Sequence, residues 1–497
     1  MESIKNLLVQ IIFGVIAVVM FSVNCIYPQI ENDLNTIQED SLRALKYINI
    51  LNSGNRQAVL EYIKTEFDSS FMQKMPVDLQ ADFQMGFYYM SAGKGYDFKK
   101  ILASGENEVK ALLLNRLTGA WIELRLPVNG SSNKKINNFI EFKAVSSPYQ
   151  NKNIKKFNDA EIVKKLDKCL KFLVKDDKFS GAIMFAKNGK PLFKEAYGMA
   201  NKSDQIPNKI DTKFNIASVG KIFTAVAVAQ LVEKGELFFT DSLSKYLPAD
   251  WLNPEISAKI QIRHLLTHTS GLGDYFGKLY GQCEKMVFSD LGDYKSLVSD
   301  QTLNFEPGTQ WSYSNTGMLL LGVVIEKITG MNYFQYLNKY IFSPSNMKNT
   351  GDFAKNRTVQ NRALGYYKEY SNGQFEWTNN SVTRVLKGNP SGGCYSTVED
   401  LLNFDIAFRS HRLLNSEYNK IVLSPKPEIS SPFEGYGFFL SQSDAGLIAR
   451  HSGDGTGISC QFSMYLDSGY TVIVLSNYSR PAADIVESVI YQLIISK

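Results

Sequence analysis

Two hairpins at opposite ends of one long segment constrain the fold most strongly. The stretch "SGAIMFAKNGKPLFKEAYG" at 180–198 has two strand-like runs joined by a tight turn at Asn188-Gly189. The stretch "CQFSMYLDSGYTVIVLSN" at 460–477 has a second pair, which turns at 467–469. Helical patterns fill the sequence between the hairpins. Strands from both ends therefore predict an α+β fold, in which one antiparallel sheet, flanked by helices, stands beside an all-helical region.

The chain is long enough for more than one domain, because its 497 residues exceed the ~100–200 of a typical domain. Residues 33–147 show helical patterns followed by four strand-like runs, which predict a small α+β domain. In the order of its elements this region resembles the NTF2-like and cystatin-like folds. Residues 148–157 are polar and begin with a proline, which predicts a linker. Residues 158–497 then form the large α+β domain.

The first 25 residues contain an apolar run from Leu7 to Val23 that follows a single lysine. Two interpretations remain open: a signal peptide that is removed on export, or a retained membrane anchor. The run is short for a spanning helix, which favours export. Cys25 stands where a lipoprotein cysteine would be, although Asn24 replaces the usual small residue. We therefore expect an exported protein, periplasmic or on the outer surface, whose membrane contact is this anchor or a lipid at Cys25.

Charge and metal-binding patterns exclude some functions. The net charge is +5, and the basic residues are scattered without a dense run, so we expect no nucleic-acid partner. His264 and His268 have the i, i+4 spacing of a zinc site, but Leu265 stands where H-E-x-x-H has its glutamate. The cysteines are too widely spaced for a zinc pattern or a disulfide framework, and are Cys25, Cys169, Cys283, Cys394 and Cys460. We expect neither a metal nor a cofactor.

Ser218 and Lys221 begin the apolar stretch "NIASVGKIFTAVAVAQLVEKGEL" at 215–237. A serine hydroxyl becomes a nucleophile when a base removes its proton, and a buried lysine with a lowered pKa can be that base. The start of a helix adds free N–H groups and the positive end of the dipole. The S-x-x-K spacing alone is not specific, and it also occurs at Ser131, Ser132, Ser242 and Ser345. Only Ser218 precedes a helix apolar enough to bury its lysine; the alternative is plain core packing.

A second candidate is Tyr313-Ser314-Asn315, which lies between a Pro-Gly turn and another apolar helix. This context holds the short Tyr-x-Asn loop against the core. A tyrosine near Lys221 can shuttle protons, and the amide of Asn315 can donate to a substrate carbonyl.

A third candidate is His451-Ser452-Gly453, on a strand that precedes the final hairpin. A strand edge with small residues lets the backbone of a substrate lie alongside it. The N–H of Asp454 can join the N–H of Ser218 in an oxyanion hole.

The three motifs occur in the order S-x-x-K, Y-x-N and [KH]-[ST]-G. Supporting segments are "IRHLLTHTSGL" at 262–272, "PGTQWSYSNTG" at 307–317 and "PSGGCYSTVEDLLNF" at 390–404. Together they resemble the serine β-lactamase and penicillin-binding protein superfamily, in its class C-like branch. The resemblance covers nearly all of residues 158–497.

The resemblance implies a covalent mechanism in which Ser218 attacks a carbonyl and water then hydrolyses the acyl-enzyme. It implies that Lys221 and Tyr313 accept and return protons. The implied substrate-binding residues are Asn315, His451, Ser452, Gly453 and Asp454.

We therefore expect an exported serine hydrolase that cleaves a peptide of the D-alanyl type, an amide or an ester, from a small-molecule, peptide or cell-wall-derived substrate. One alternative is a true β-lactamase, and His451, in place of the lysine that suits a substrate carboxylate, weighs against it. A second alternative is a non-catalytic ligand-binding or sensing protein on the same fold.

Overall fold

The computed structural model describes residues 39–130, 134–146, 157–277, 280–281, 288–354, 358–371, 374–381 and 387–496. The expected signal peptide or anchor, Cys25, Cys283 and nearly all of the expected linker lie outside these ranges. The chain divides into two compact units, within residues 1–154 and 155–497, and each is described by itself. Across the described residues, we find no helix with the length and apolar character needed to cross a membrane.

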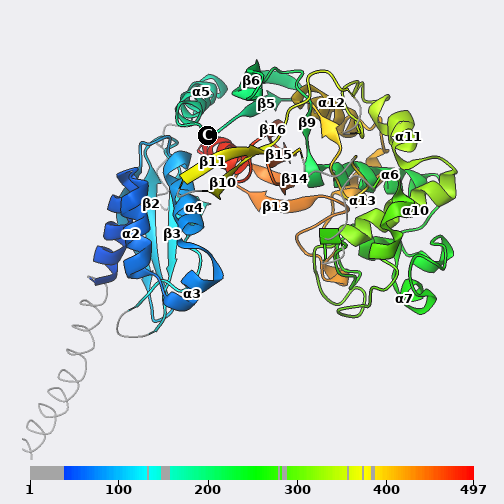
Figure 1. Cartoon of the computed structure of the whole chain (residues 1–497), viewed down its shortest axis with the longest axis horizontal. Coiled ribbons are helices and arrows are strands. Elements are labelled where there is room, and N and C mark those ends of the chain that lie inside the picture. Colours follow the sequence, from blue (N-terminus) through cyan, green and yellow to red (C-terminus); the bar gives the residue numbers. More distant parts are fainter. Residues whose placement is uncertain are drawn as a thin grey trace, which may run out of the picture. The chain divides into compact units, whose positions relative to one another are not determined.

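The N-terminal unit packs helices against a four-stranded antiparallel meander in the order β1-β2-β3-β4 (Figure 1). Its elements are a helix over 39–52, α2 (Arg56–Glu66), α3 (Ser69–Lys74), α4 (Val77–Met90), β1 (Tyr96–Ser104), β2 (Glu108–Asn115), β3 (Trp121–Pro127) and β4 (Glu141–Val145). Buried residues such as Leu113, Ile122 and Leu124 line the face of the sheet that meets the helices. A small N-terminal α+β unit is therefore present, and its likeness to NTF2-like or cystatin-like folds stays a prediction.

The second unit is built on a six-stranded antiparallel sheet in the order β13-β14-β15-β16-β5-β6. Its strands are β5 (Gly181–Lys187), β6 (Lys190–Tyr197), β13 (Phe439–Ser443), β14 (Gly446–Gly455), β15 (Ile458–Tyr465) and β16 (Tyr470–Ser476). At its centre β16 pairs with β5, with Ile473 opposite Met184. The prediction that one antiparallel sheet joins the two ends of this region is confirmed.

Helices cover both faces of this sheet because side chains along a strand alternate between the faces. On one face, Ser459 Oγ donates to Asp484 of α14 over 3.1 Å. On the other, Phe462 packs on Phe404 of α12, with 6.0 Å between ring centroids, and Cys460 Sγ donates to the carbonyl of Asn215, just ahead of the turn that carries Ser218. The helices involved are α5 (Asp159–Lys175), α12 (Val398–Arg409) and α14 (Ala482–Ile495).

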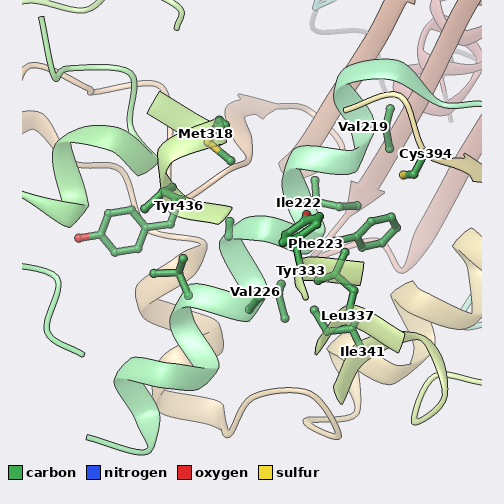
Figure 2. Packing of buried hydrophobic residues seen from close by; sticks show 14 of the residues in the cluster. Val219, Ile222, Phe223, Val226, Met318, Tyr333, Leu337, Ile341, Cys394 and Tyr436 are labelled. Carbon is green, nitrogen blue, oxygen red and sulfur yellow. The ribbon is translucent and has the colours of Figure 1, made fainter. Parts of the chain in front are cut away.

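A separate helical region surrounds α6, in agreement with the predicted all-helical part (Figure 1). Its members are α6 (Lys221–Glu233), α7 (Pro254–Lys259), α8 (Ile262–Leu266), α10 (Asn315–Thr329), α11 (Tyr333–Leu337) and α13 (Ser416–Val422). Every residue of α6 from Lys221 to Val232 is buried, as expected for a helix that is apolar all round. Figure 2 shows Phe223 and Val226 of α6 among apolar side chains of neighbouring segments. This packing gives the start of α6 a rigid support.

Short elements complete the second unit. They are β7 (Met199–Asn201), β8 (Ile206–Pro207), β9 (Phe214–Asn215), β10 (Tyr366–Ser371), β11 (Gln374–Asn379), β12 (Tyr395–Ser396), and the short helices η1 (Ala217–Gly220), η2 (Leu243–Lys245), η4 (Leu291–Leu297), η5 (Asn338–Phe342) and η6 (Pro427–Ile429). The pairing of β9 with β12 matters for function, because it fixes the backbone of the residues that lead directly into η1.

Candidate active site

Ser218 lies in η1, one turn of 3₁₀ helix directly ahead of α6, and not in the α-helix itself. The preceding residue, Ala217, has a φ of +43°, a left-handed conformation that L-residues rarely adopt. The turn is held in place because Asn215 Oδ1 accepts the Ala217 N–H over 2.9 Å and the Ile216 N–H donates to the carbonyl of Cys394. Strained backbone held in this way is common at functional sites.

Lys221 is fully buried directly behind Ser218, with Nζ 3.0 Å from Ser218 Oγ. Nζ also lies 2.7 Å from Asn315 Oδ1, and it donates to the carbonyl of Ser391. These two oxygens only accept hydrogen bonds, so they take both N–H groups of a neutral amine. The lone pair of the neutral amine then faces the hydroxyl of Ser218.

The protonation state of Lys221 suits this geometry. Burial lowers its pKa to about 7, although Asp274, Glu434 and Asp454 act in the opposite direction. A large fraction of Lys221 is therefore neutral near pH 7, which is the state that a general base requires.

Tyr313 is hydrogen-bonded to Ser218, and the centroid of its ring lies 4.9 Å from Lys221 Nζ. Burial raises the pKa of Tyr313 well above its usual value, and the hydrogen bond with Ser218 offsets this only in part. Tyr313 is therefore a neutral phenol at neutral pH. Of the two predicted proton acceptors, Lys221 is therefore the one suited to act as a base, and Tyr313 is suited to pass a proton onward.

Asn315 begins α10 and is held by Asp274, a residue that the sequence analysis missed. Asp274 Oδ2 accepts from Asn315 Nδ2 over 2.7 Å and from its backbone N–H over 3.2 Å. With its Oδ1 occupied by Lys221, Asn315 keeps one Nδ2 hydrogen for a substrate carbonyl. No spacing rule connects Asp274 to Asn315, 41 residues later, so only the fold reveals the pair.

The loop before β12 supports both Ser218 and Lys221. The Gly393 N–H donates to the carbonyl of Ala217 over 3.1 Å. Gly392 has a φ of +142°, and a Cβ there would lie 2.4 Å from that same carbonyl oxygen. Ser391 contributes the carbonyl that binds Lys221, and its Oγ lies 2.7 Å from Tyr275 Oη. The segment that begins at Pro390 thus supports the turn of Ser218 directly.

His451 lies on β14 and is only 2% exposed. Its Nδ1 must donate to the carbonyl of Ser452, 2.7 Å away, because a carbonyl oxygen only accepts. Nε2 is therefore a bare acceptor, and it has no partner among the described residues. Burial lowers the pKa of His451 to about 3, and nearby Lys221 acts in the same direction. His451 is neutral and does not supply the positive charge of a lysine.

A cavity of about 470 Å³ brings these groups together. Of the predicted site residues it is lined by Ser218, Tyr313, Asn315, His451, Ser452 and Asp454. Lys221 is buried behind the serine, and Gly453 lies against the Ser218 turn, where an added Cβ would meet the Ile216 carbonyl at 2.2 Å. Asp454 is the one charged side chain among the described lining residues. Aromatic rings of Tyr275, Phe276, Tyr280 and Phe439 form an apolar wall.

The other patterns in the sequence do not reach this cavity. Ser242 is the N-cap of η2, and its partner Lys245 pairs with Asp241 at the surface. Ser345 does not line the cavity, and Ser131 and Ser132 lie outside the described residues. His264 Nδ1 accepts the N–H of Gln261, and the described part of the chain contains no cluster of three metal-binding side chains.

Fold and site together define the class of protein: a serine hydrolase of the β-lactamase and transpeptidase type, in which a serine and a buried lysine meet beside an antiparallel sheet. The chain matches the family model described as Beta-lactamase over residues 162–493, and it belongs to this family.

The proteins to which this chain is similar include penicillin-binding proteins and an esterase. The chain is similar to penicillin-binding protein 4* of Bacillus subtilis (strain 168), with 32% identity over 314 residues, which cover 60% of this chain and 68% of that protein. It is 31% identical over 211 residues to esterase EstB of Burkholderia gladioli, covering 39% of this chain and 52% of that protein. The crystal structure of a penicillin-binding protein from Bacillus halodurans aligns with a TM-score of 0.58 and 32% identity, over 64% of this chain and 97% of that one.

Proposed function

We propose that the protein hydrolyses an amide or ester bond through a covalent acyl-enzyme on Ser218. The observation that carries this proposal is the position of Lys221 Nζ, 3.0 Å from Ser218 Oγ, with both N–H directions of the neutral amine taken by carbonyl oxygens. Such a lysine can only present its lone pair to the serine. A serine with a positioned base and a lining cavity is the arrangement of covalent catalysis.

The reaction then proceeds in two stages. Ser218 Oγ forms a bond to the substrate carbonyl carbon as its proton passes to Lys221, and the carbonyl π electrons move to the oxygen. We place this oxyanion at the N–H groups of Ser218 and Asp454. When the oxyanion collapses, the bond to the leaving group breaks, and Tyr313 relays the proton from Lys221 to that group. Water then attacks the acyl carbonyl carbon and gives a proton to Lys221. The bond between that carbon and Ser218 Oγ breaks, Lys221 returns the proton to Oγ, and the carboxylic acid product leaves.

The polar groups of the cavity indicate which substrates fit best. Asp454 presents a negative charge at the cavity, which favours a hydrogen-bond donor or a cation on the substrate, and the buried, neutral His451 supplies no positive charge. Neither attracts the free carboxylate that penicillins, cephalosporins and C-terminal D-alanine carry beside the scissile bond. We therefore expect amides and esters that carry an amino group to be better substrates than β-lactams and than peptides with a free C-terminus. The aromatic wall provides room for an apolar side chain.

A matched substrate series tests this order. We expect the full-length protein to cleave D-alanine p-nitroanilide with a kcat/KM about 3- to 10-fold above that for its N-acetyl derivative, because one partly solvated ion pair with Asp454 is worth about 1 kcal/mol. Asp454→Asn should remove this preference and leave the N-acetyl substrate unaffected. Nitrocefin, which carries a carboxylate, should be the poorest of the three.

Two outcomes would count against the proposal. Turnover of nitrocefin faster than of both anilides would favour the β-lactamase alternative. Rates for every substrate no higher than those of Ser218→Ala, with saturable ligand binding, would favour the non-catalytic alternative.

A further inference from the structure

A buried carboxyl group lies close to the catalytic residues and is not used in the reaction described above. Glu434 belongs to the segment before β13, and its side chain is fully buried. Its Oε2 accepts from Trp311 Nε1 over 2.8 Å and, more weakly, from Ser431 Oγ over 3.5 Å. Its Oε1 has no hydrogen-bond partner among the described residues. An unsatisfied buried oxygen is costly, so its presence needs a reason.

A ring nitrogen of His268 lies across from this oxygen. The Nδ1 of His268 accepts the N–H of Ser314 over 3.2 Å, so the proton of the neutral ring is on Nε2. That Nε2 faces Glu434 Oε1 at 3.7 Å. The ring of His268 also packs on Tyr313, with 4.3 Å between centroids, and its carbonyl accepts the N–H of Ser312 over 2.9 Å. His268 therefore holds the backbone on both sides of Tyr313.

We propose that Glu434, acting through His268, is a positioning residue that orients Tyr313 and sets the electrostatic field in which Ser218 and Lys221 exchange a proton. Trp311 ties the carboxyl group to the same loop, two residues before Tyr313. Glu434 thus contacts the Tyr-x-Asn loop directly through Trp311 and faces His268, which holds the loop from the other side. The inference rests on the proposed function, because it concerns the proton transfer of that reaction.

Several titratable groups lie in or beside this buried region. They are Lys221 from α6, His268 and Asp274 from the segment after α8, Tyr313 from the loop before α10, and His451 and Asp454 from β14. Burial raises the pKa of Glu434 to about 8, close to the pKa of about 7 for Lys221, and Lys221 in turn lowers it. Burial keeps both histidines neutral in this range. An ionised Glu434 stabilises the protonated form of Lys221 and so raises its pKa.

The test is the pH dependence with which a fluorophosphonate acylates Ser218 in the full-length protein. Because Glu434 ionises near pH 8, the wild-type rate should keep rising between about pH 7 and pH 9, whereas Glu434→Gln should level off once Lys221 is deprotonated, so that the midpoint of its rising limb lies at lower pH by about half a unit or more. Trp311→Phe removes the N–H that stabilises the carboxylate of Glu434. It should therefore move the rising limb of the pH profile in the same direction as Glu434→Gln, but by a smaller amount. Glu434→Asp keeps the charge and should leave the limb near its wild-type position. The matched control is Glu487→Gln, which neutralises a buried carboxyl group on α14 and should change nothing.

A second readout does not depend on reactivity. Ionisation of Glu434 beside the indole should produce a change in the tryptophan fluorescence with a midpoint near pH 8, absent from both Glu434→Gln and Trp311→Phe. If Glu434 had only a structural role, Glu434→Gln should lower the acylation rate by the same factor at every pH and leave the midpoint of the pH profile unmoved. This result would overturn the inference while the proposed function stands. If the wild-type protein is not acylated at all, the proposed function fails, and the inference fails with it.

Discussion

Replacing Lys221 with methionine is expected to lower kcat/KM for a p-nitroanilide or ester by ~10³-fold or more, because it removes the only base within hydrogen-bond reach of Ser218 among the described residues. Methionine has a similar length and suits a buried, apolar position. The matched control is Lys245→Met, which alters an S-x-x-K lysine at the surface. Its activity should stay close to that of the wild type. A loss of less than about tenfold in Lys221→Met would contradict the assignment of the base.

The same substitution has a stability signature whose sign follows from linkage. The pKa of Lys221 falls from its usual value of 10.5 to about 7 on folding. Below pH 7 both the folded and the unfolded protein hold this proton, whereas between about pH 7 and pH 10.5 the unfolded protein holds more. The lysine therefore destabilises the fold most at low pH, and this penalty decreases as the pH rises. Lys221→Met should raise Tm more at pH 6 than at pH 9, which thermal melts at the two pH values can measure.

Gly453→Val is expected to lower kcat/KM by about 100-fold or more, because a small displacement of a reacting group has effects of this size. A Cβ at this position would lie 2.2 Å from the Ile216 carbonyl oxygen and 3.1 Å from the Ala217 Cβ. Both atoms belong to the turn that carries Ser218, and backbone atoms cannot rotate out of the way. Strand β14 and this turn must therefore move apart. We also expect a loss of about 1–3 kcal/mol in the free energy of unfolding, as for other overpacked sites.

Gly351→Ala provides a control for Gly453→Val, because the atoms nearest to an added Cβ there belong to the ring of Phe353, and the nearest of them is 3.6 Å away, an ordinary contact distance. Steady-state kinetics and urea unfolding of both variants measure the two effects. Wild-type kinetics in Gly453→Val would mean that the third position of the H-x-G motif does not need a glycine. The close contact between β14 and the Ser218 turn would then have no part in catalysis.

The sheet and the nucleophile could be predicted because each has a strong local signal. Alternating strands around Asn188-Gly189 and 467–469 define two hairpins, and these pair through β5 and β16 in the structure. The apolar run after Ser218 predicts a buried helix, and a lysine at its start must then be buried as well. One local detail differs from the prediction: Ser218 lies in a 3₁₀ turn. The left-handed Ala217, fixed by Asn215, prevents the helical backbone from extending back beyond Ser218.

The supporting residues could not be predicted because their signals are not local. Asp274 and Glu434 are carboxylates in irregular segments, and nothing in their neighbouring sequence indicates that they are near Lys221. Their roles depend on contacts across the fold, such as the bond from Trp311 to Glu434 over 123 positions. The protonation states of Tyr313 and His451 likewise follow from burial, which no motif specifies.

The most direct test of the central claim is mass spectrometry of the protein after incubation with a fluorophosphonate, followed by peptide mapping. If Ser218 is the nucleophile and Lys221 its base, the protein should gain a single adduct on the peptide that contains Ser218. Labelling should be absent in Ser218→Ala and strongly slowed in Lys221→Met, and in the wild type its rate should rise with pH around a midpoint near 7. Equal labelling of the wild type and Ser218→Ala, or an adduct on another residue, would contradict the account.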